Sequence, residues 1–190
     1  TSENSEEPFP DFLESDKPNQ LISWIKQQDE QIVLLASGDP LWFGIGRVLL
    51  DHFPTDRLVF HPSPTSLQLA FSRLARPWQD STWISLHGRD STPLVKLLNK
   101  RPESIGILID PNRGGAKEVR EIICACQLEK VYQFWIFENL GHEKERIYQI
   151  THEEALPSLQ PLHLVVLIKK KPTIDKGKNI PLFGIEDGFY

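Results

Sequence analysis

The strongest constraint on the fold is an alternation between short apolar runs and amphipathic stretches along the chain. The apolar runs are rich in branched residues and predict buried strands at 31–36, 58–61, 82–86, 104–109, 132–137, 146–150 and 162–168. Helical periodicity predicts helices between them at 19–28, 41–53, 66–75, 92–99 and 116–127. An α/β fold follows.

The chain divides into two predicted lobes with a cleft between them. Pro54, Pro62 and Pro64 interrupt the region between the lobes and prevent a continuous helix there. We expect an N-terminal α/β lobe at 1–60, a C-terminal α/β lobe at 61–171 and a tail or linker at 172–190. The short spacing between the strands at 132–137 and 146–150 favours antiparallel pairing there, and therefore mixed sheets. The Lys169-Lys170-Lys171 run is interpreted as a solvated strand end.

Charge and composition exclude several classes of protein. The net charge of −5 disfavours nucleic-acid binding, which rests on a basic surface. The apolar runs are far shorter than the roughly 18–20 residues of a membrane span, so no membrane association is expected. Cys124 and Cys126 are too few and too close for a disulfide framework, which favours a cytoplasmic location, and we assign them no metal.

The segment from Ser37-Gly38-Asp39-Pro40 to Gly44 directly follows the first predicted strand, where open α/β sheets bind ligands. One interpretation is a plain strand-to-helix turn, with Asp39 as the helix N-cap and Pro40 in the first turn. That does not explain Gly44 and Gly46, which would each cost about 1 kcal/mol inside the helix predicted at 41–53. Close approach of a ligand or of a neighbouring element would explain these two glycines.

Three other strand ends carry polar groups. Thr65 and Ser66 precede a helix, and Thr65 has the capping-box spacing with Gln68. His87-Gly88-Arg89 combines a titratable ring with a cation suited to carboxylates. The segment Glu138-Asn139-Leu140-Gly141 also ends a strand. Each has a purely structural alternative: a helix cap, a structural histidine, a turn.

Other motifs of catalysis and cofactor binding are missing from the sequence. Gly44 and Gly46 stand too late for a dinucleotide fingerprint, and Gly114-Gly115 lacks the Lys-Ser/Thr of a phosphate loop. The residue order supports no hydrolase triad and no zinc motif.

Taken together, these strand-end segments resemble the tetrapyrrole methylase family. Ser37-Gly38-Asp39-Pro40-Leu41-Trp42-Phe43-Gly44 looks like its Gly-Asp-Pro loop, and Phe137-Glu138-Asn139-Leu140-Gly141 looks like a later family segment. The stretches 62–74, 77–80 and 85–89 resemble one branch, the N-terminal C5-methylating half of precorrin-6Y C5,15-methyltransferases, or the cobalt-precorrin-7 C5-methyltransferase type.

The chain departs from the family pattern in two places. The family opens with a strand and a Gly-x-Gly-Pro-Gly loop, and nothing before Gln31 resembles them. We therefore expect the N-terminal lobe to lack its first strand. Ser63-Pro64 replaces the Pro-Gly that many members carry before the two hydroxyl residues, which we expect to be a tolerated change of turn.

The resemblance implies S-adenosylmethionine as cofactor and methylation of C5 of precorrin-6Y or cobalt-precorrin-7 in cobalamin biosynthesis. It implies cofactor contacts from Ser37, Gly38, Asp39, Trp42, Thr65, Ser66, His87 and Leu140. Asp39 and His87 are the candidates for a catalytic base, and Arg47 and Arg89 for binding of the substrate carboxylates. It allows a homodimer and a fused or separate decarboxylating methyltransferase partner.

Two alternatives remain open. A non-catalytic or truncated module of the same fold would bind tetrapyrrole or an adenosyl ligand without turnover. Another branch of the superfamily would methylate ribosomal RNA or a diphthamide precursor, although the acidic balance disfavours RNA.

Overall fold

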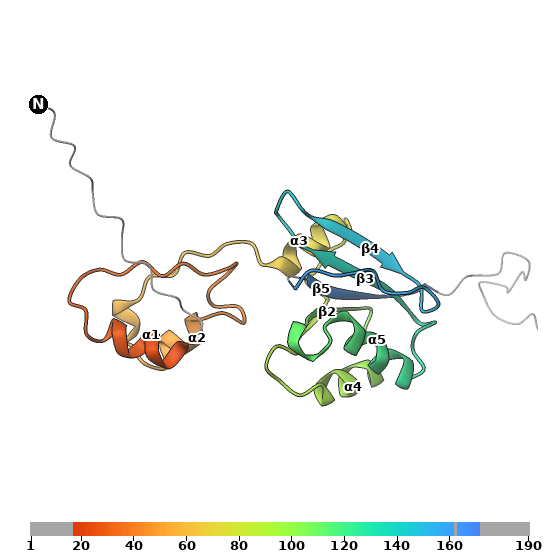
Figure 1. Ribbon diagram of the computed structural model, residues 1–190, viewed down its shortest axis with the longest axis horizontal. Helices are drawn as coiled ribbons and strands as arrows, with labels where there is room; N and C mark the ends of the chain where they lie inside the picture. Colours follow the sequence, from red (N-terminus) through yellow and green to blue (C-terminus); the bar gives the residue numbers. More distant parts are fainter. Residues whose placement is uncertain (1–16, 162, 172–190) are drawn as a thin grey trace, which may run out of the picture. The chain divides into compact units, whose positions relative to one another are not determined.

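The computed structural model describes residues 17–161 and 163–171, and the chain forms two compact units (Figure 1). The N-terminal unit runs to Gln79 and includes Leu140–Glu143, and the C-terminal unit holds Asp80–Asn139 and the chain from Lys144. The contacts thus divide the chain after Gln79, whereas the predicted lobes at 1–60 and 61–171 stay a prediction. The tail predicted at 172–190 lies outside the described residues.

The C-terminal unit is built on a five-stranded mixed sheet in the order β1-β2-β5-β3-β4. Its strands are β1 (Thr82–Ser85), β2 (Ser104–Leu108), β3 (Tyr132–Glu138), β4 (Arg146–Ile150) and β5 (His163–Lys169). β1 and β2 are parallel, and the β2–β5, β5–β3 and β3–β4 pairs are antiparallel. The predictions of an α/β fold and of mixed pairing are confirmed. The carboxyl ends of β1, β2 and β3 therefore lie at the same edge of the sheet.

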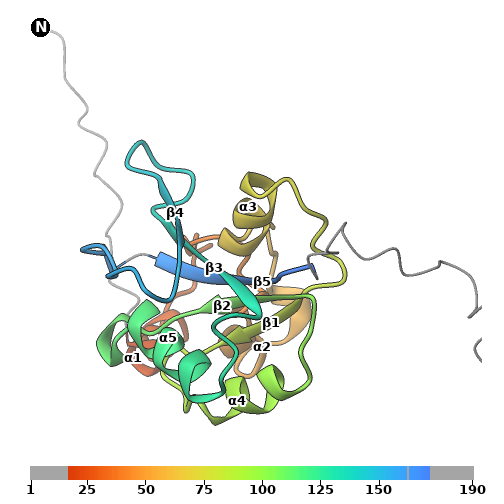
Figure 2. The same cartoon turned by 90° about the vertical axis from the view of Figure 1, so that its right-hand side faces the viewer.

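The helices α4 (Thr92–Asn99) and α5 (Ala116–Ala125) lie against the same face of this sheet (Figure 2). Each presents an apolar stripe to the strands, as amphipathic helices do. Their buried residues join those of the strands in one core that includes Leu94, Leu98, Val119, Ile107 and Leu167. The opposite face of β5 is buried too, since Leu164, Val166 and Ile168 are at most 3% exposed.

The N-terminal unit contains short helices joined by loops. They are α1 (Pro18–Ile25), α2 (Gly46–Leu50), the 3₁₀ turn η1 (Thr55–Arg57) and α3 (Ser66–Arg73). The capping box predicted for α3 is present: the Thr65 hydroxyl accepts from the Gln68 amide at 3.2 Å, and the Gln68 side-chain oxygen accepts from the Thr65 amide at 2.8 Å.

Two predictions for the N-terminal unit were wrong. The runs 31–36 and 58–61 form no strand, and Val33, Leu35 and Val59 are 79%, 77% and 80% exposed. A strand exists only where a neighbouring strand accepts its hydrogen bonds, and no described segment pairs with either run. The helix predicted at 41–53 shortens to Gly46–Leu50. The C-terminal unit holds the second 3₁₀ turn, η2 (Pro111–Arg113).

None of the helices in the described ranges is both long and apolar enough to cross a membrane.

Candidate functional site

Asp39 organises a tight turn. Its Oδ1 accepts from the Leu41 amide at 2.8 Å, and its carbonyl accepts from the Trp42 amide at 3.2 Å. This is the side-chain turn that Asp favours. The predicted role as N-cap of a helix was therefore wrong in detail, because α2 begins only at Gly46 and Ile45 is its N-cap.

Gly44 and Gly46 are explained by a close backbone approach. A Cβ atom on either would lie 2.6 Å from the Pro40 carbonyl oxygen, which accepts from the Gly46 amide at 2.8 Å. Of the two explanations offered for these glycines, the structure shows the neighbouring element. The chain folds back on Pro40 and closes the Gly-Asp-Pro turn into a compact loop.

The Gly-Asp-Pro loop and the start of α3 lie side by side. Gly38 has φ +71°, and a Cβ there would lie 3.6 Å from Thr65 Cα and 3.7 Å from the Pro64 carbonyl oxygen. The glycine thus leaves bare backbone next to the capped helix start, where Thr65 is buried and Ser66 half-buried. Two segments that are distant in sequence and carry predicted cofactor contacts are brought together.

Leu140 and Gly141 belong to this same unit. Gly141 has φ +81°, and its Cβ position would lie 3.5 Å from Leu69 Cδ1 on α3. The segment that holds the predicted contact residue Leu140 therefore reaches α3 at Gly141, although it follows β3 in the chain. A left-handed glycine makes this turn possible.

The His87-Gly88-Arg89 segment follows β1 in the C-terminal unit. Gly88 has φ +62°, and its amide donates to Asp110 Oδ2 at 2.9 Å. Arg113 Nη1 donates to the Arg89 carbonyl oxygen at 2.7 Å. Asp110 and Arg113, which follow β2, thus hold the backbone of this turn. His87 and Arg89 themselves are exposed.

Asp110 was missed by the sequence analysis. It is 6% exposed, and besides Gly88 its Oδ1 accepts from the Asn112 amide at 3.0 Å. The Gly88 amide chiefly, with the Asn112 amide and the charges of His87 and Arg113, holds the pKa of Asp110 below its usual range. Its sequence signal was available, because Asp110-Pro111 follows an apolar run in the sequence, as Asp39-Pro40 does.

Glu138, at the end of β3, is a second buried acid, which the sequence analysis named only as part of the segment 138–141. It is 0% exposed, its Oε2 accepts from the Tyr148 hydroxyl at 3.1 Å, and its Oε1 accepts from the Gln160 amide. Its β5 neighbour His163 accepts from the Ala116 amide through Nε2 at 3.2 Å. These bonds are structural, because they fasten the segment before β5 and the start of α5.

Two further predicted residues lie in the N-terminal unit. Trp42 is half-buried and its ring meets Phe43 edge-on at 4.8 Å, and Arg47 is exposed on α2. The structure brings Gly38, Thr65 and the Leu140 segment together within one unit, and their convergence with His87 and Arg89 stays a prediction. Among the described residues, no three His, Cys, Asp or Glu side chains group as metal ligands would.

The fold is similar to that of solved methyltransferase structures. A solved structure titled uroporphyrin-III C-methyl transferase from Thermus thermophilus, complexed with S-adenyl homocysteine, superposes with a TM-score of 0.57. The superposition covers 78% of this chain and 70% of that one at 20% identity, so it establishes the fold alone. The fold of this chain is therefore the fold of that methyltransferase structure.

The chain itself belongs to the family of Tetrapyrrole (Corrin/Porphyrin) Methylases, whose model matches residues 14–156. The resemblance inferred from the strand-end motifs is thereby confirmed.

This chain is similar to two curated proteins with names that specify a reaction. Cobalt-precorrin-7 C(5)-methyltransferase of Salmonella typhimurium is 33% identical over 67% of this chain and 62% of its own length. The decarboxylating precorrin-6Y C(5,15)-methyltransferase of a Sinorhizobium species is 27% identical over 77% of this chain and 35% of its own. The chain thus matches less than two thirds of either relative.

Proposed function

We propose that this chain binds S-adenosylmethionine and methylates a carbon of a precorrin, C5 of precorrin-6Y or cobalt-precorrin-7, in the cytoplasm. One observation carries the proposal: Gly38 of the Gly-Asp-Pro loop lies against the capped start of α3 at Thr65, within a chain of the tetrapyrrole methylase family. The names of the two curated relatives support the substrate class.

The residues at this loop fit the cofactor. Gly38 carries no side chain and presents bare backbone beside Thr65, so a ligand can approach the backbone closely there. Asp39 is half-buried and accepts one hydrogen bond from Leu41, which fixes its carboxylate as a partner for hydroxyl or ammonium donors. We assign cofactor contacts to Ser37, Gly38, Asp39, Trp42, Thr65, Ser66, His87 and Leu140.

S-adenosylmethionine supplies an electrophilic methyl group on a sulfonium. The chain's contribution is to hold the ring carbon and that methyl in line and to exclude water, and good orientation contributes on the order of 7–11 kcal/mol in well-aligned reactions. Asp39 and His87 are the candidates to accept the proton released from the ring carbon after methylation. Arg47 and Arg89 are both exposed and are assigned to the carboxylate arms of the substrate.

The first test is calorimetric binding of S-adenosylhomocysteine to the chain, to Asp39→Asn and to the control Asp56→Asn. Asp56 lies in the same unit on η1. Micromolar binding that Asp39→Asn weakens at least about tenfold, a loss of about 1.4 kcal/mol, supports the site. Absence of binding, or equal weakening by both variants, contradicts it.

The second test distinguishes an enzyme from a non-catalytic module. The chain is incubated with S-adenosylmethionine and precorrin-6Y or cobalt-precorrin-7, and the tetrapyrrole is analysed by mass spectrometry. Gain of one methyl group supports catalysis. Cofactor binding without methyl transfer would favour the binding module instead.

We also propose that the chain forms a homodimer, or that it acts with a decarboxylating methyltransferase that is either fused to it or separate. The name of the Sinorhizobium relative, of which this chain matches 35%, supports the partner.

A further inference from the structure

The turn that carries His87 and Arg89 is held at two points by the loop that follows β2. The Gly88 amide donates to Asp110 Oδ2 at 2.9 Å, and the Arg89 carbonyl oxygen accepts from Arg113 Nη1 at 2.7 Å. The turn therefore donates one hydrogen bond to the loop and accepts another from it. We call Asp110 and Arg113, with these two bonds, the clamp.

The position of the His87 ring depends on the backbone of this turn. The Arg89 amide donates to the Leu86 carbonyl oxygen at 3.0 Å, and Gly88 between them has φ +62°. A glycine with positive φ at the third position of such a turn leaves His87 at the corner, where it is exposed, whereas Leu86 is buried. Among the described residues, none forms a hydrogen bond or an ion pair with the His87 ring. The direction of the ring is thus set by the backbone of the turn.

Asp110 is buried, and both of its carboxylate oxygens accept hydrogen bonds. It is 6% exposed, and Oδ1 accepts from the Asn112 amide at 3.0 Å while Oδ2 accepts from the Gly88 amide. The Gly88 amide is the chief cause that holds the pKa of Asp110 below its usual range, because it stabilises the charged form. The charge of His87 contributes to the same shift, so the two side chains lie close enough to interact. Asp110 is therefore an ionised anchor for the backbone.

The loop that carries the clamp is itself fixed. The Asp110 carbonyl oxygen accepts from the Arg113 and Gly115 amides at 3.1 and 3.0 Å. Gly115 has φ +56°, and a Cβ atom there would lie 2.7 Å from His163 Nε2, which accepts from the Ala116 amide at 3.2 Å. Because His163 begins β5, the loop is tied to the sheet at both of its ends. The clamp cannot move away from the turn without breaking these bonds.

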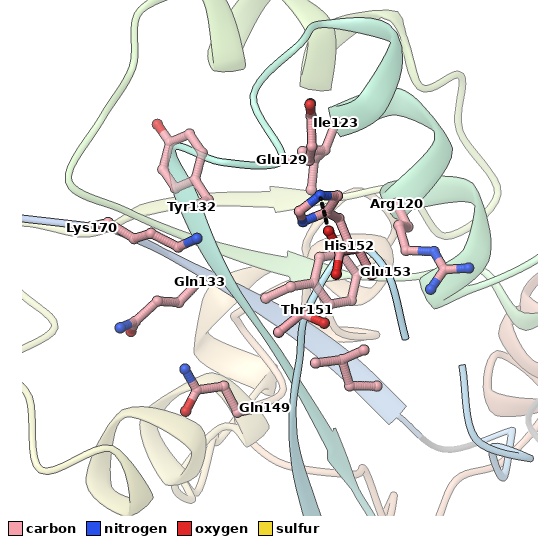
Figure 3. A pocket seen from close by; sticks show the side chains of 12 residues that line it. Arg120, Ile123, Glu129, Tyr132, Gln133, Gln149, Thr151, His152, Glu153 and Lys170 are labelled. Atoms are coloured by element: carbon pink, nitrogen blue, oxygen red, sulfur yellow. Dashed lines mark ion pairs between the residues drawn. The ribbon is translucent and has the colours of Figure 1, made fainter. Parts of the chain in front are cut away.

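The opposite edge of the sheet provides a control position. A pocket of about 230 Å³ opens there, lined by the first residues of β3, the last of β4 and Lys170 (Figure 3). Its wall includes His152 and Glu153, whose Nε2 and Oε1 atoms lie 3.6 Å apart, but no described residue of the turn or of the clamp. Removal of the Glu153 charge therefore changes the net charge as loss of Asp110 does, without touching the clamp.

We propose that Asp110 is a positioning residue for methyl transfer and that it acts through His87. This inference rests on the proposed function, in which His87 contacts the cofactor and is a candidate to accept the released proton. The clamp fixes the turn before any ligand binds, so the ring needs no rearrangement when the reaction begins. Misplacement of a reacting group by about 1 Å can cost on the order of 100-fold in rate. Arg113 holds the second point, from which the Arg89 side chain extends.

The first arm of the test examines the clamp with no ligand present. Asp110→Ala removes both acceptor oxygens, so exchange of the Gly88 amide in ¹H–¹⁵N spectra should become at least about tenfold faster relative to the amides of β5. Asp110→Asn keeps the shape and one acceptor oxygen and should have a smaller effect in the same direction. Unchanged exchange at Gly88 in both variants, or equal acceleration at Gly88 and in β5, would overturn the clamp.

The second arm measures kcat and KM for methyl transfer from S-adenosylmethionine to precorrin-6Y or cobalt-precorrin-7, with each variant shown to be folded by circular dichroism. Asp110→Ala should lower kcat at least about tenfold in the parent chain. In a chain that already carries His87→Gln it should lower kcat by less than about twofold, because a residue that acts through His87 loses its effect once His87 is replaced. The control Glu153→Gln should leave kcat and KM unchanged. Asp110→Asn repeats the comparison with less risk to folding.

The outcomes separate this inference from the proposed function. Absence of methyl transfer by the parent chain contradicts the proposed function and removes this inference with it. Methyl transfer by the parent chain with the same kcat in the folded Asp110 variants overturns this inference alone. Equal losses of kcat with and without His87→Gln also overturn it, since they would show that Asp110 acts independently of His87.

Discussion

Two apolar segments of this chain, 31–36 and β5, are similar in sequence and opposite in outcome. In β5 the residues from Leu164 to Ile168 are at most 3% exposed and pair with β2 on one side and β3 on the other. In 31–36, Val33 and Leu35 are 79% and 77% exposed and pair with no described strand. Apolar, branched residues predict a strand, but the presence of a neighbouring strand decides whether they form one.

The largest expected effect tests that contrast with one chemical change in both segments. Leu167→Ala should lower the free energy of unfolding by about 2–5 kcal/mol, because it opens a cavity among fully buried residues. Leu35→Ala should change it by less than about 0.5 kcal/mol. Urea unfolding followed by far-ultraviolet circular dichroism measures both. An equal cost at Leu35 would show that 31–36 is buried by a partner in solution.

A second pair of variants asks whether the loop-rich unit is nevertheless tightly packed at Pro40. Gly46→Ala places a methyl group 2.6 Å from the Pro40 carbonyl oxygen and should cost about 1–3 kcal/mol. Gly88→Ala meets open space and carries only the strain of φ +62°, about 1 kcal/mol. Hydrogen exchange of the amides in 38–50 and in 85–90 measures the loss of protection in each of the two variants. Unchanged protection at 38–50 in Gly46→Ala would mean that this loop is already open.

Removal of the capping box of α3 should have a smaller effect on the free energy of unfolding. Thr65→Ala removes the acceptor of the Gln68 amide and should cost about 1 kcal/mol, whereas Thr65→Ser keeps it and should cost little. Thermal unfolding and the exchange of the α3 amides report the difference. Equal behaviour of the two variants would show that α3 is held by its buried Leu67 and Phe71 alone.

The smallest effect is a dependence on pH in the C-terminal unit. The Gly88 amide depresses the folded-state pKa of Asp110, so its stabilising contribution is present above the unfolded value of about 3.9 and is lost as pH falls through the folded value. Asp110→Asn should therefore lose less stability than the parent chain on acidification. Urea unfolding repeated at a series of pH values tests this, and parallel curves would contradict it.

Much of the C-terminal unit could be predicted from the sequence. The ranges of α4 and β4 match the predictions, and the other helix and strand ends shift by a few residues or fewer. The predictions of these segments are accurate because burial on one or both faces follows the apolar pattern of the sequence. Strand order could not be predicted, because pairing β5 between β2 and β3 depends on contacts between residues far apart in the chain.

The candidate site was predictable where its geometry is local. The capping box at Thr65 and the turn at Asp39 follow from residue types at short spacing. The partner of Asp110 could not be predicted, because its bond to the Gly88 amide joins two strand ends that become neighbours only in the sheet.

The central position of β5 has a consequence for biosynthesis. Residue 104 pairs with residue 168, and β2 and β3 become joined only through β5. During translation, β1 to β4 therefore leave the ribosome before the strand that unites them has been made. Two apolar strand edges stay uncovered over that interval, and such edges associate readily with other chains. The sheet should thus close late and in a single step, and slow elongation between β4 and β5 should lower the yield of folded protein.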